Sequence, residues 1–232
     1  MPDDQTWFQS ALRRFALPVA RRVIYRTIQP GPLGRPLYSA LFHADWMGNE
    51  AFEWARRSLV ATPTFLARCA RHGDRISVDR LPYLVGPCRI ELGSDIRISG
   101  KITIRGASRA HPLLRVGSGV FIGHGCSFNM VEGITIGDFA SLGAMTFVAD
   151  NEGHANYNPG RPIWEVPAAP RDIAPVVIED NVQIGRECMI LKGVRIGARS
   201  IIGARSVVRG DVPPDSVVMG NPARVVKRMT VA

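Results

Sequence analysis

One histidine of this chain lies in a stretch that has neither helix nor strand periodicity. His154 belongs to the segment from 149 to 175, which is rich in proline. A loop of this length inside a compact domain is usually functional. A neutral imidazole, with a pKa of about 6.5, can take the proton of a hydroxyl group while that group attacks an electrophile. His154 is therefore the first candidate for a catalytic base.

Three other side chains of this segment have open roles. Asp150 or Glu152 could orient the His154 ring through its second nitrogen, or both could be solvated loop acids. Trp164 either takes part in a site or packs on the wall of the domain. The sequence leaves these alternatives open.

The charge of the chain favours an anionic partner. Its 232 residues include 29 Lys and Arg against 20 Asp and Glu, which gives a net charge of +9. Such an excess attracts nucleic acid, anionic lipid or a phosphorylated small molecule. Nucleic acid is not expected as a partner, because the sequence has neither the aromatic platforms nor the recognition helix that such binding uses.

Metal sites and disulfides are not expected. The four cysteines are far apart and form no C-x-x-C pair. His124 and His154 are 30 residues apart, without the closely spaced histidines of a zinc site.

The N-terminus has no signal-peptide core, and no apolar run is long enough to span a bilayer, so we expect a cytoplasmic protein.

A period of six residues predicts the element that holds these side chains. A β-branched aliphatic residue stands at every sixth position in six consecutive hexads, at Ile178, Ile184, Ile190, Ile196, Ile202 and Val208. The same period can be traced upstream, with gaps, as far as Ile90. Three hexads form one turn of a three-sided coil that rises about 4.8 Å, with the aliphatic residues inside. The sequence thus predicts a mainly β protein, a parallel β-helix over 88–220 from which the loop 149–175 is extruded.

The chain before this coil has helix signals, so we expect an N-terminal helical region over 1–87. Asn49 is expected to cap one helix, and Thr62 with Pro63 is expected to start another that ends near Gly73. Residues 221–232 are expected to form a C-terminal tail.

A basic amphipathic segment lies still earlier in the chain. Apolar residues at helical spacing alternate with arginines over 7–26. Such a helix could pack its apolar stripe on the coil or on a neighbouring subunit, or it could lie on an anionic membrane surface. The sequence is compatible with both, and a peripheral position at the inner membrane is one expectation.

The end of the coil resembles a known family. The segment DVPPDSVVMGNPARVVKR, from Asp211 to Arg228, is similar to the C-terminal end of the hexapeptide-repeat acyltransferases, and the resemblance extends over about 88–228. It implies a left-handed β-helix, a homotrimer, and transfer of an acetyl group from acetyl-CoA to a hydroxyl or amine. The segment PVVIEDNVQIG, from 175 to 185, is most similar to the sugar O-acetyltransferases of the galactoside, maltose, nodulation-factor and capsule type. Glu179 and Gln183 depart from the Gly and Trp that are usual there.

The resemblance also implies site residues. His154, which follows Gly153, corresponds to the catalytic base. Asn129 corresponds to an asparagine that positions the acceptor or the histidine, or it is a corner residue with left-handed φ. The residues implied to bind CoA are Arg186, Ala204, Arg209, Gly210, Arg224 and Lys227. Each arginine alone could be a solvated charge, whereas together they favour an anion-binding edge.

The function implied is an acetyl-CoA-dependent O-acetyltransferase acting on a saccharide, including a polysaccharide or a lipid-linked precursor. A thioester is already activated, so the acceptor could attack it directly in a ternary complex, without an acyl-enzyme. One alternative is an N-acetyltransferase of an amino sugar or xenobiotic. Another is a non-catalytic β-helix that serves as an assembly or binding module.

Overall fold

The computed structural model describes residues 31–32, 34–107, 111–153, 160, 162, 165–166 and 169–229. The chain divides into two compact units, 1–51 and 52–232. His154, Trp164 and the basic segment 7–26 lie outside the described residues, so the expectations placed on them stay predictions.

The helix α3 (Arg35–Ala55) begins in the first unit and has no buried residue. It passes through Asn49, whose side-chain amide donates to the Asp45 carboxylate at 3.1 Å. The expected helix start at Asn49 is therefore wrong, because this side chain bonds within the helix and caps no backbone N–H. Within the described part of the chain, no helix combines the length and the apolar character needed to cross a bilayer.

In the second unit a π-helical segment, Arg56–Ala61, leads into the short helix α4 (Thr62–Leu66). Thr62 does not start a new helix, since the chain is already helical before it. Its hydroxyl instead accepts a hydrogen bond from the Val78 backbone N–H at 3.0 Å. Phe65 of α4 is buried with the core of the coil, so this helix closes the first turn.

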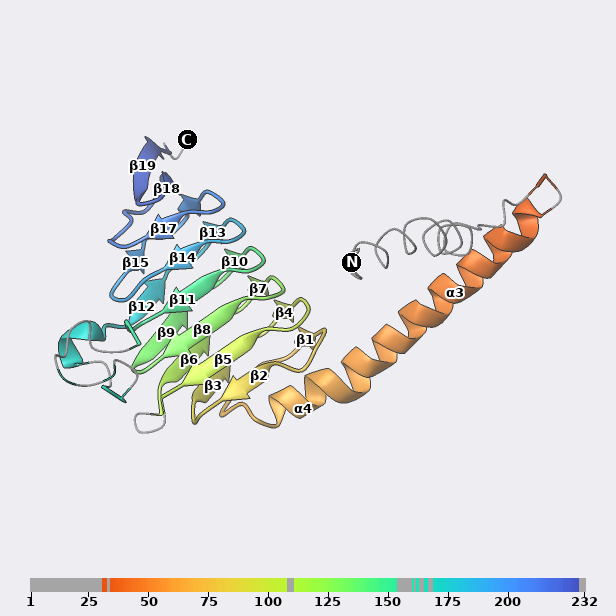
Figure 1. Ribbon diagram of the computed structural model, residues 1–232, viewed down its shortest axis with the longest axis horizontal. Helices are drawn as coiled ribbons and strands as arrows, with labels where there is room; N and C mark the ends of the chain where they lie inside the picture. Colours follow the sequence, from red (N-terminus) through yellow and green to blue (C-terminus); the bar gives the residue numbers. More distant parts are fainter. Residues whose placement is uncertain are drawn as a thin grey trace, which may run out of the picture. The chain divides into compact units, whose positions relative to one another are not determined.

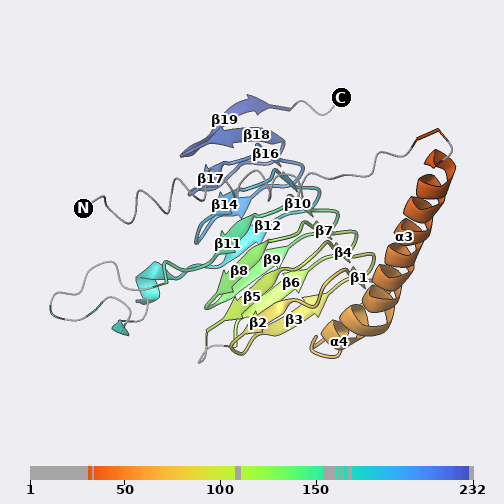
Figure 2. The same ribbon diagram turned by 45° about the vertical axis from the view of Figure 1, so that its right-hand side comes forward.

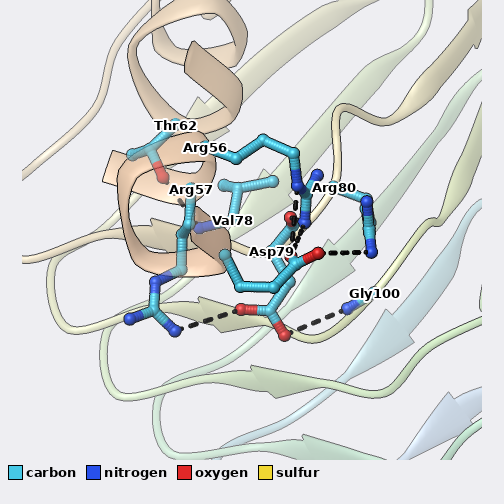
Figure 3. A network of polar contacts seen from close by, with 8 residues as sticks. Arg56, Arg57, Thr62, Val78, Asp79, Arg80 and Gly100 are labelled. Atoms are coloured by element: carbon cyan, nitrogen blue, oxygen red, sulfur yellow. Dashed lines mark hydrogen bonds and ion pairs between the residues drawn. The ribbon is translucent and has the colours of Figure 1, made fainter. Parts of the chain in front are cut away.

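Polar contacts around Asp79 join the helical segment to the coil (Figure 3). Arg56 donates to the Asp79 carbonyl at 2.7 Å, and Arg57 lies 3.6 Å from the Asp79 carboxylate. The same carboxylate accepts the backbone N–H of Gly100 at 3.2 Å. One aspartate thus connects the helical segment with the next turn of the coil.

The coil consists of three sheets, whose strands lie above one another in Figures 1 and 2. Sheet 1 contains, in spatial order, β1 (Ser77–Val78), β4 (Arg97–Ile98), β7 (Phe121–Ile122), β10 (Ser141–Leu142), β13 (Gln183–Ile184), β16 (Ile201–Ile202), β18 (Ser216–Gly220) and β19 (Ala223–Arg228). Sheet 2 contains β2 (Tyr83–Val85), β5 (Thr103–Gly106), β8 (Ser127–Met130), β11 (Phe147–Ala149), β14 (Met189–Ile190) and β17 (Val207–Val208). Sheet 3 contains β3 (Arg89–Leu92), β6 (Leu113–Val116), β9 (Gly133–Ile136), β12 (Val176–Ile178) and β15 (Arg195–Ile196).

The strands pair in parallel along the coil, and only the last pair, β18 and β19, is antiparallel among the described strands. Ile184 pairs with Ile202 and Ile178 with Ile196, in each case 18 residues on. All four side chains are buried, which confirms the three-sided coil of six-residue steps.

The coil begins earlier than the expected boundary at 88. Val78 and Leu84 continue the six-residue period back from Ile90 and place β1 and β2 in the coil. The end also differs from a free tail, because β19 pairs with β18 and extends sheet 1 into 221–232.

The long loop leaves the coil between β11 and β12. Its two ends meet in a bridge between Asn151 and Ile173, close to a 3₁₀ turn at Pro170–Asp172. The expected extruded loop is thus present, with a closed neck at its base.

Candidate active site

Side chains that point outward from sheet 2 form a column along the coil, here called the outer column. Val85, Arg105, Asn129 and Ala149 are paired in register on β2, β5, β8 and β11. Leu191 and Arg209 follow β14 and β17 at the equivalent step. Neighbouring strands are about 4.8 Å apart, so Asn129 and Arg209 lie roughly 14 Å apart along the column. The coil thus places two residues that are 80 positions apart in sequence on one face.

A buried carboxylate fixes the neck of the loop beside Asn129. Both oxygens of Asp150 accept hydrogen bonds from the backbone N–H groups of Val131, Glu132 and Gly133, at 2.7 to 3.1 Å. The Asn151 amide donates to the same carboxylate at 2.8 Å. Asp150 is fully buried. Asp150 is therefore not a solvated loop acid, because its oxygens hold the turn at 131–133, and the suggestion that it orients the His154 ring stays a prediction.

Asn151 connects this buried group to the surface. Its side-chain amide also donates to the Asn129 carbonyl at 3.2 Å, and its oxygen accepts the Gly153 backbone N–H at 2.8 Å. The backbone of Gly153 has a φ of +84°, which residues with a Cβ rarely adopt. The neck therefore holds Gly153 next to Asn129, at the point where the loop departs.

Lys192 ties the two sides of the neck together. Its ammonium lies 3.0 Å from the Glu152 carboxylate and donates to the Arg171 carbonyl at 2.9 Å. The Glu152 backbone N–H donates to the Asp172 carbonyl at 3.2 Å. Glu152, the second residue suggested as an orienting group, is thus paired with a lysine of the coil.

A cavity of about 540 Å³ lies along the outer column above this neck and is here called the main cavity. It is lined by Asn129, Phe147, Ala149, Asn151, Glu152, Gly153, Leu191, Lys192 and Arg209. Its walls are apolar at Phe147 and Leu191 and cationic at Lys192 and Arg209. Ligand sites of this size combine apolar walls with a few placed polar groups.

A second cavity, of about 370 Å³, continues from Arg209 toward the end of the coil. Gly210 and Arg224 line it together with Arg209. No atom lies within 4 Å of the position that a Gly210 Cβ would take, so a ligand can approach this backbone. Three of the six residues expected to bind CoA therefore share one cavity.

The other three expected CoA residues lie elsewhere. Arg186 and Ala204 occupy the corner between sheets 1 and 2, one above the other, and the Arg205 N–H donates to the Arg186 carbonyl at 2.8 Å. Lys227 is exposed on β19, opposite Val217. None of these three lines the two cavities at Arg209. The expected stacking at 18 residues is correct, whereas the proposed CoA contacts remain predictions.

The alternative reading of Asn129 was a corner residue with left-handed φ, and the structure does not place Asn129 at a corner. It lies within β8, between Arg105 and Ala149, so that alternative is wrong. Left-handed φ occurs instead at corner residues such as His111, at +45°, and Asn181, at +56°.

Several lining residues were missed by the sequence analysis. No sequence motif marks these residues, which are Arg105, Phe147, Asn151 and Lys192. What they share is that the register of the coil places each of them next to Asn129 or next to the loop.

The described residues contain no group of three His, Cys, Asp or Glu side chains that could hold a metal ion.

Comparisons with known proteins agree with this architecture. The family model of the bacterial transferase hexapeptide (six repeats) matches residues 175–210, and the model of the hexapeptide repeat of succinyl-transferase matches 114–148. A 2,3,4,5-tetrahydropyridine-2,6-dicarboxylate N-acetyltransferase of Staphylococcus aureus is 48% identical over 59 residues, which are 25% of this chain and 25% of that protein. The chain thus matches a quarter of the length of such relatives.

Solved structures show the same fold. AntD, an N-acyltransferase from Bacillus cereus in complex with dTDP and coenzyme A, superposes with a TM-score of 0.61 at 22% identity, over 73% of this chain and 89% of that one. A complex of AntD with dTDP-4-amino-4,6-dideoxyglucose and coenzyme A gives 0.59 at 21% identity, over 73% and 89% of the two chains. These relatives are N-acyltransferases, so they do not support the narrower resemblance to sugar O-acetyltransferases. Residues 114–148 and 175–210 thus match hexapeptide-repeat models of bacterial transferases, and the chain folds as the expected left-handed β-helix.

Proposed function

We propose that this protein is an acetyl-CoA-dependent acetyltransferase whose acceptor is an amino group on a saccharide derivative. The observation that carries the proposal is the pair of cavities that share Arg209 and run along the outer column to the neck of the loop. One end of this path is basic and the other end is the point from which the histidine-bearing loop departs.

The path suits the shape of acetyl-CoA. Its phosphates would lie at Arg209 and Arg224, where two guanidinium groups and the open Gly210 backbone can receive an anion. The thin pantetheine arm would follow the apolar walls at Phe147 and Leu191. The thioester would then reach Asn129, roughly 14 Å from Arg209 at three strand spacings of about 4.8 Å.

The reaction needs a base at that end of the path. His154 follows Gly153 directly, so its Cα lies about 3.8 Å from the Gly153 Cα. In the proposed step the acceptor nitrogen attacks the thioester carbonyl and passes a proton to the imidazole. The tetrahedral intermediate then re-forms its carbonyl as the C–S bond breaks, and the thiolate of CoA receives the proton. The Asn129 amide, on the same face, is placed to position the acceptor.

The choice of an amine over a hydroxyl rests on the relatives. The similar proteins named above are N-acyltransferases, and AntD was crystallised with an amino sugar linked to a nucleotide. Transfer to a hydroxyl remains the second candidate, because the segment 175–185 and the Gly153–His154 pair resemble the sugar O-acetyltransferases.

We further propose that the protein assembles as a homotrimer, as the family resemblance implies. The exposed aromatic side chains of α3, among them Phe42 and Trp46, support association with another surface. Light scattering of the purified protein tests this, since a trimer has three times the 25.4 kDa mass of the chain. We also propose that the basic segment 7–26 contacts an anionic membrane surface, which vesicle sedimentation tests.

The experiment that tests the function follows CoA thiol release with wild-type protein, acetyl-CoA and matched amine and hydroxyl acceptors. We expect faster release with amines, and a loss of about 10²- to 10⁴-fold in kcat for His154→Ala with acetyl-CoA binding preserved. His72→Ala is the matched control, because His72 is exposed in the first turn of the coil, away from the cavities. Undiminished turnover in His154→Ala would remove the proposed base, and the absence of both transfer and acetyl-CoA binding would favour a non-catalytic module.

A further inference from the structure

A third cavity lies on the other side of Asn129 from Arg209. Its volume is about 280 Å³, and it is lined by Arg105, Gly106, Ala107, Asn129, Met130, Val131, Asn151 and Gly153. Asn129, Asn151 and Gly153 also line the main cavity of about 540 Å³, so the two spaces meet at the neck of the loop. A donor that enters from Arg209 would leave this third cavity to the acceptor.

Arg105 is the charged residue of that cavity, and it has no partner among the residues that the structure describes. It points outward from β5 and is exposed, and its guanidinium forms no hydrogen bond or ion pair with any described residue. Some arginines of the coil are paired with a carboxylate, as Arg75 is with Asp95 and Arg199 with Asp215. The arginine beside the site is thus uncommitted, whereas these structural arginines are neutralised.

No described Asp or Glu lines the third cavity, and no described carboxylate forms an ion pair with Arg105. The Asp150 oxygens at the neck are engaged by backbone N–H groups and the Asn151 amide. Of residues 108–110 and 154–168, the acidic one in the sequence is Glu165, which is exposed and forms no ion pair with Arg105. A ligand is therefore the natural source of negative charge at this position.

The phosphates of CoA are not that source. Arg105 and Arg209 are four strand spacings apart on the outer column, or roughly 19 Å at about 4.8 Å each. In the proposed mode of CoA binding the thioester lies between them, one strand spacing from Arg105. An anion on Arg105 must therefore belong to the acceptor.

We propose that the acceptor carries an anionic group, phosphate or carboxylate, which Arg105 binds within about one sugar ring of the nucleophile. This inference rests on the proposed function and narrows its substrate class. A planar guanidinium can hold either group through two parallel hydrogen bonds, which fixes the orientation of the acceptor as well as its affinity.

The test compares acceptors that differ by the anionic group alone. Glucosamine 1-phosphate and muramic acid place a phosphate or a carboxylate next to the 2-amino group, and glucosamine is the neutral-ring reference. Glucose 1-phosphate and glucose form the matching pair for a hydroxyl acceptor. We expect wild-type kcat/KM to favour one of the anionic acceptors over its reference by at least roughly tenfold, the value of one charge-assisted contact. The acceptor that is preferred, the phosphate or the carboxylate, shows which anionic group Arg105 binds.

Variants then assign the preference to Arg105. Arg105→Ala should remove it, with a loss of roughly 10- to 100-fold on the anionic acceptor and little change on the reference, while Arg105→Lys keeps part of it. Arg97→Ala is the matched control, since Arg97 is exposed on sheet 1 and has no side-chain partner among the described residues. Equal kcat/KM for anionic and neutral acceptors in active wild-type protein would overturn this inference alone. No transfer to any acceptor would overturn the proposed function as well.

Discussion

The Asp150 carboxylate should be essential to the neck of the loop, although it is buried beneath the site. In Asp150→Ala three backbone N–H groups at 131–133 and the Asn151 amide lose their acceptor. A hydrogen bond is worth about 1 to 1.5 kcal/mol net, and more when the acceptor is charged. The four lost hydrogen bonds should therefore lower the free energy of unfolding by about 4 to 6 kcal/mol. At roughly 2 to 4 °C per kcal/mol for a chain of this size, Tm should fall by about 8 to 24 °C.

Thermal unfolding followed by circular dichroism measures this effect. Asp138→Ala is the control, because the exposed Asp138 carboxylate accepts one backbone N–H, from Ser118, at 2.7 Å. We expect its Tm to change by less than about 4 °C. If Asp150→Ala unfolded within 2 °C of wild type, on the order of the control effect, the carboxylate would not hold the turn and the reasoning would be refuted.

Two further predictions follow from charges elsewhere on the coil. Arg209→Ala should raise KM for acetyl-CoA roughly tenfold with kcat little changed, because a cation at the phosphate end is lost. A steady-state assay with Arg97→Ala as the control measures this effect. An unchanged KM would contradict the prediction. The hydrogen bond from Arg71, followed by the charges of Arg71 and Arg89, holds the pKa of Glu91 below its usual range. A lowered folded pKa gives stability that is present above the unfolded pKa of about 4.3 and lost as pH falls through the folded value. The Tm of Glu91→Gln should thus lie below that of wild type at pH 7 and approach it in acid, and curves that stay parallel down to about pH 2 would disprove the linkage.

The coil could be predicted because its period is local. Each aliphatic residue from Ile178 to Val208 enters the core at the same step, so the sequence alone specifies three sheets and a stack at 18 residues. Its first turn was missed because Leu84, at the next step back, is not β-branched. The helix start at Asn49 was misplaced because a helix propensity signal does not tell a cap from a residue inside a longer helix.

The site was harder to predict because it depends on the register across the breaks in the coil. Asp150 reaches a turn 17 to 19 residues earlier, and nothing in its local sequence separates a buried cap from a solvated loop acid. Arg105 on β5 is paired in register with Asn129 on β8. Predicting this pair requires the length of the loop between the two strands to be known. The family motifs identified Arg209, Gly210 and Arg224, which share a cavity, but gave no indication of the acceptor side.

A crystal structure of the protein with CoA tests the central claim most directly. We predict that the phosphates lie at Arg209 and Arg224 and that the pantetheine arm follows the outer column past Leu191, with its sulfur beside Asn129 and Gly153. A CoA molecule bound on another sheet, or with its sulfur directed away from Gly153, would contradict the assignment of this face as the active site.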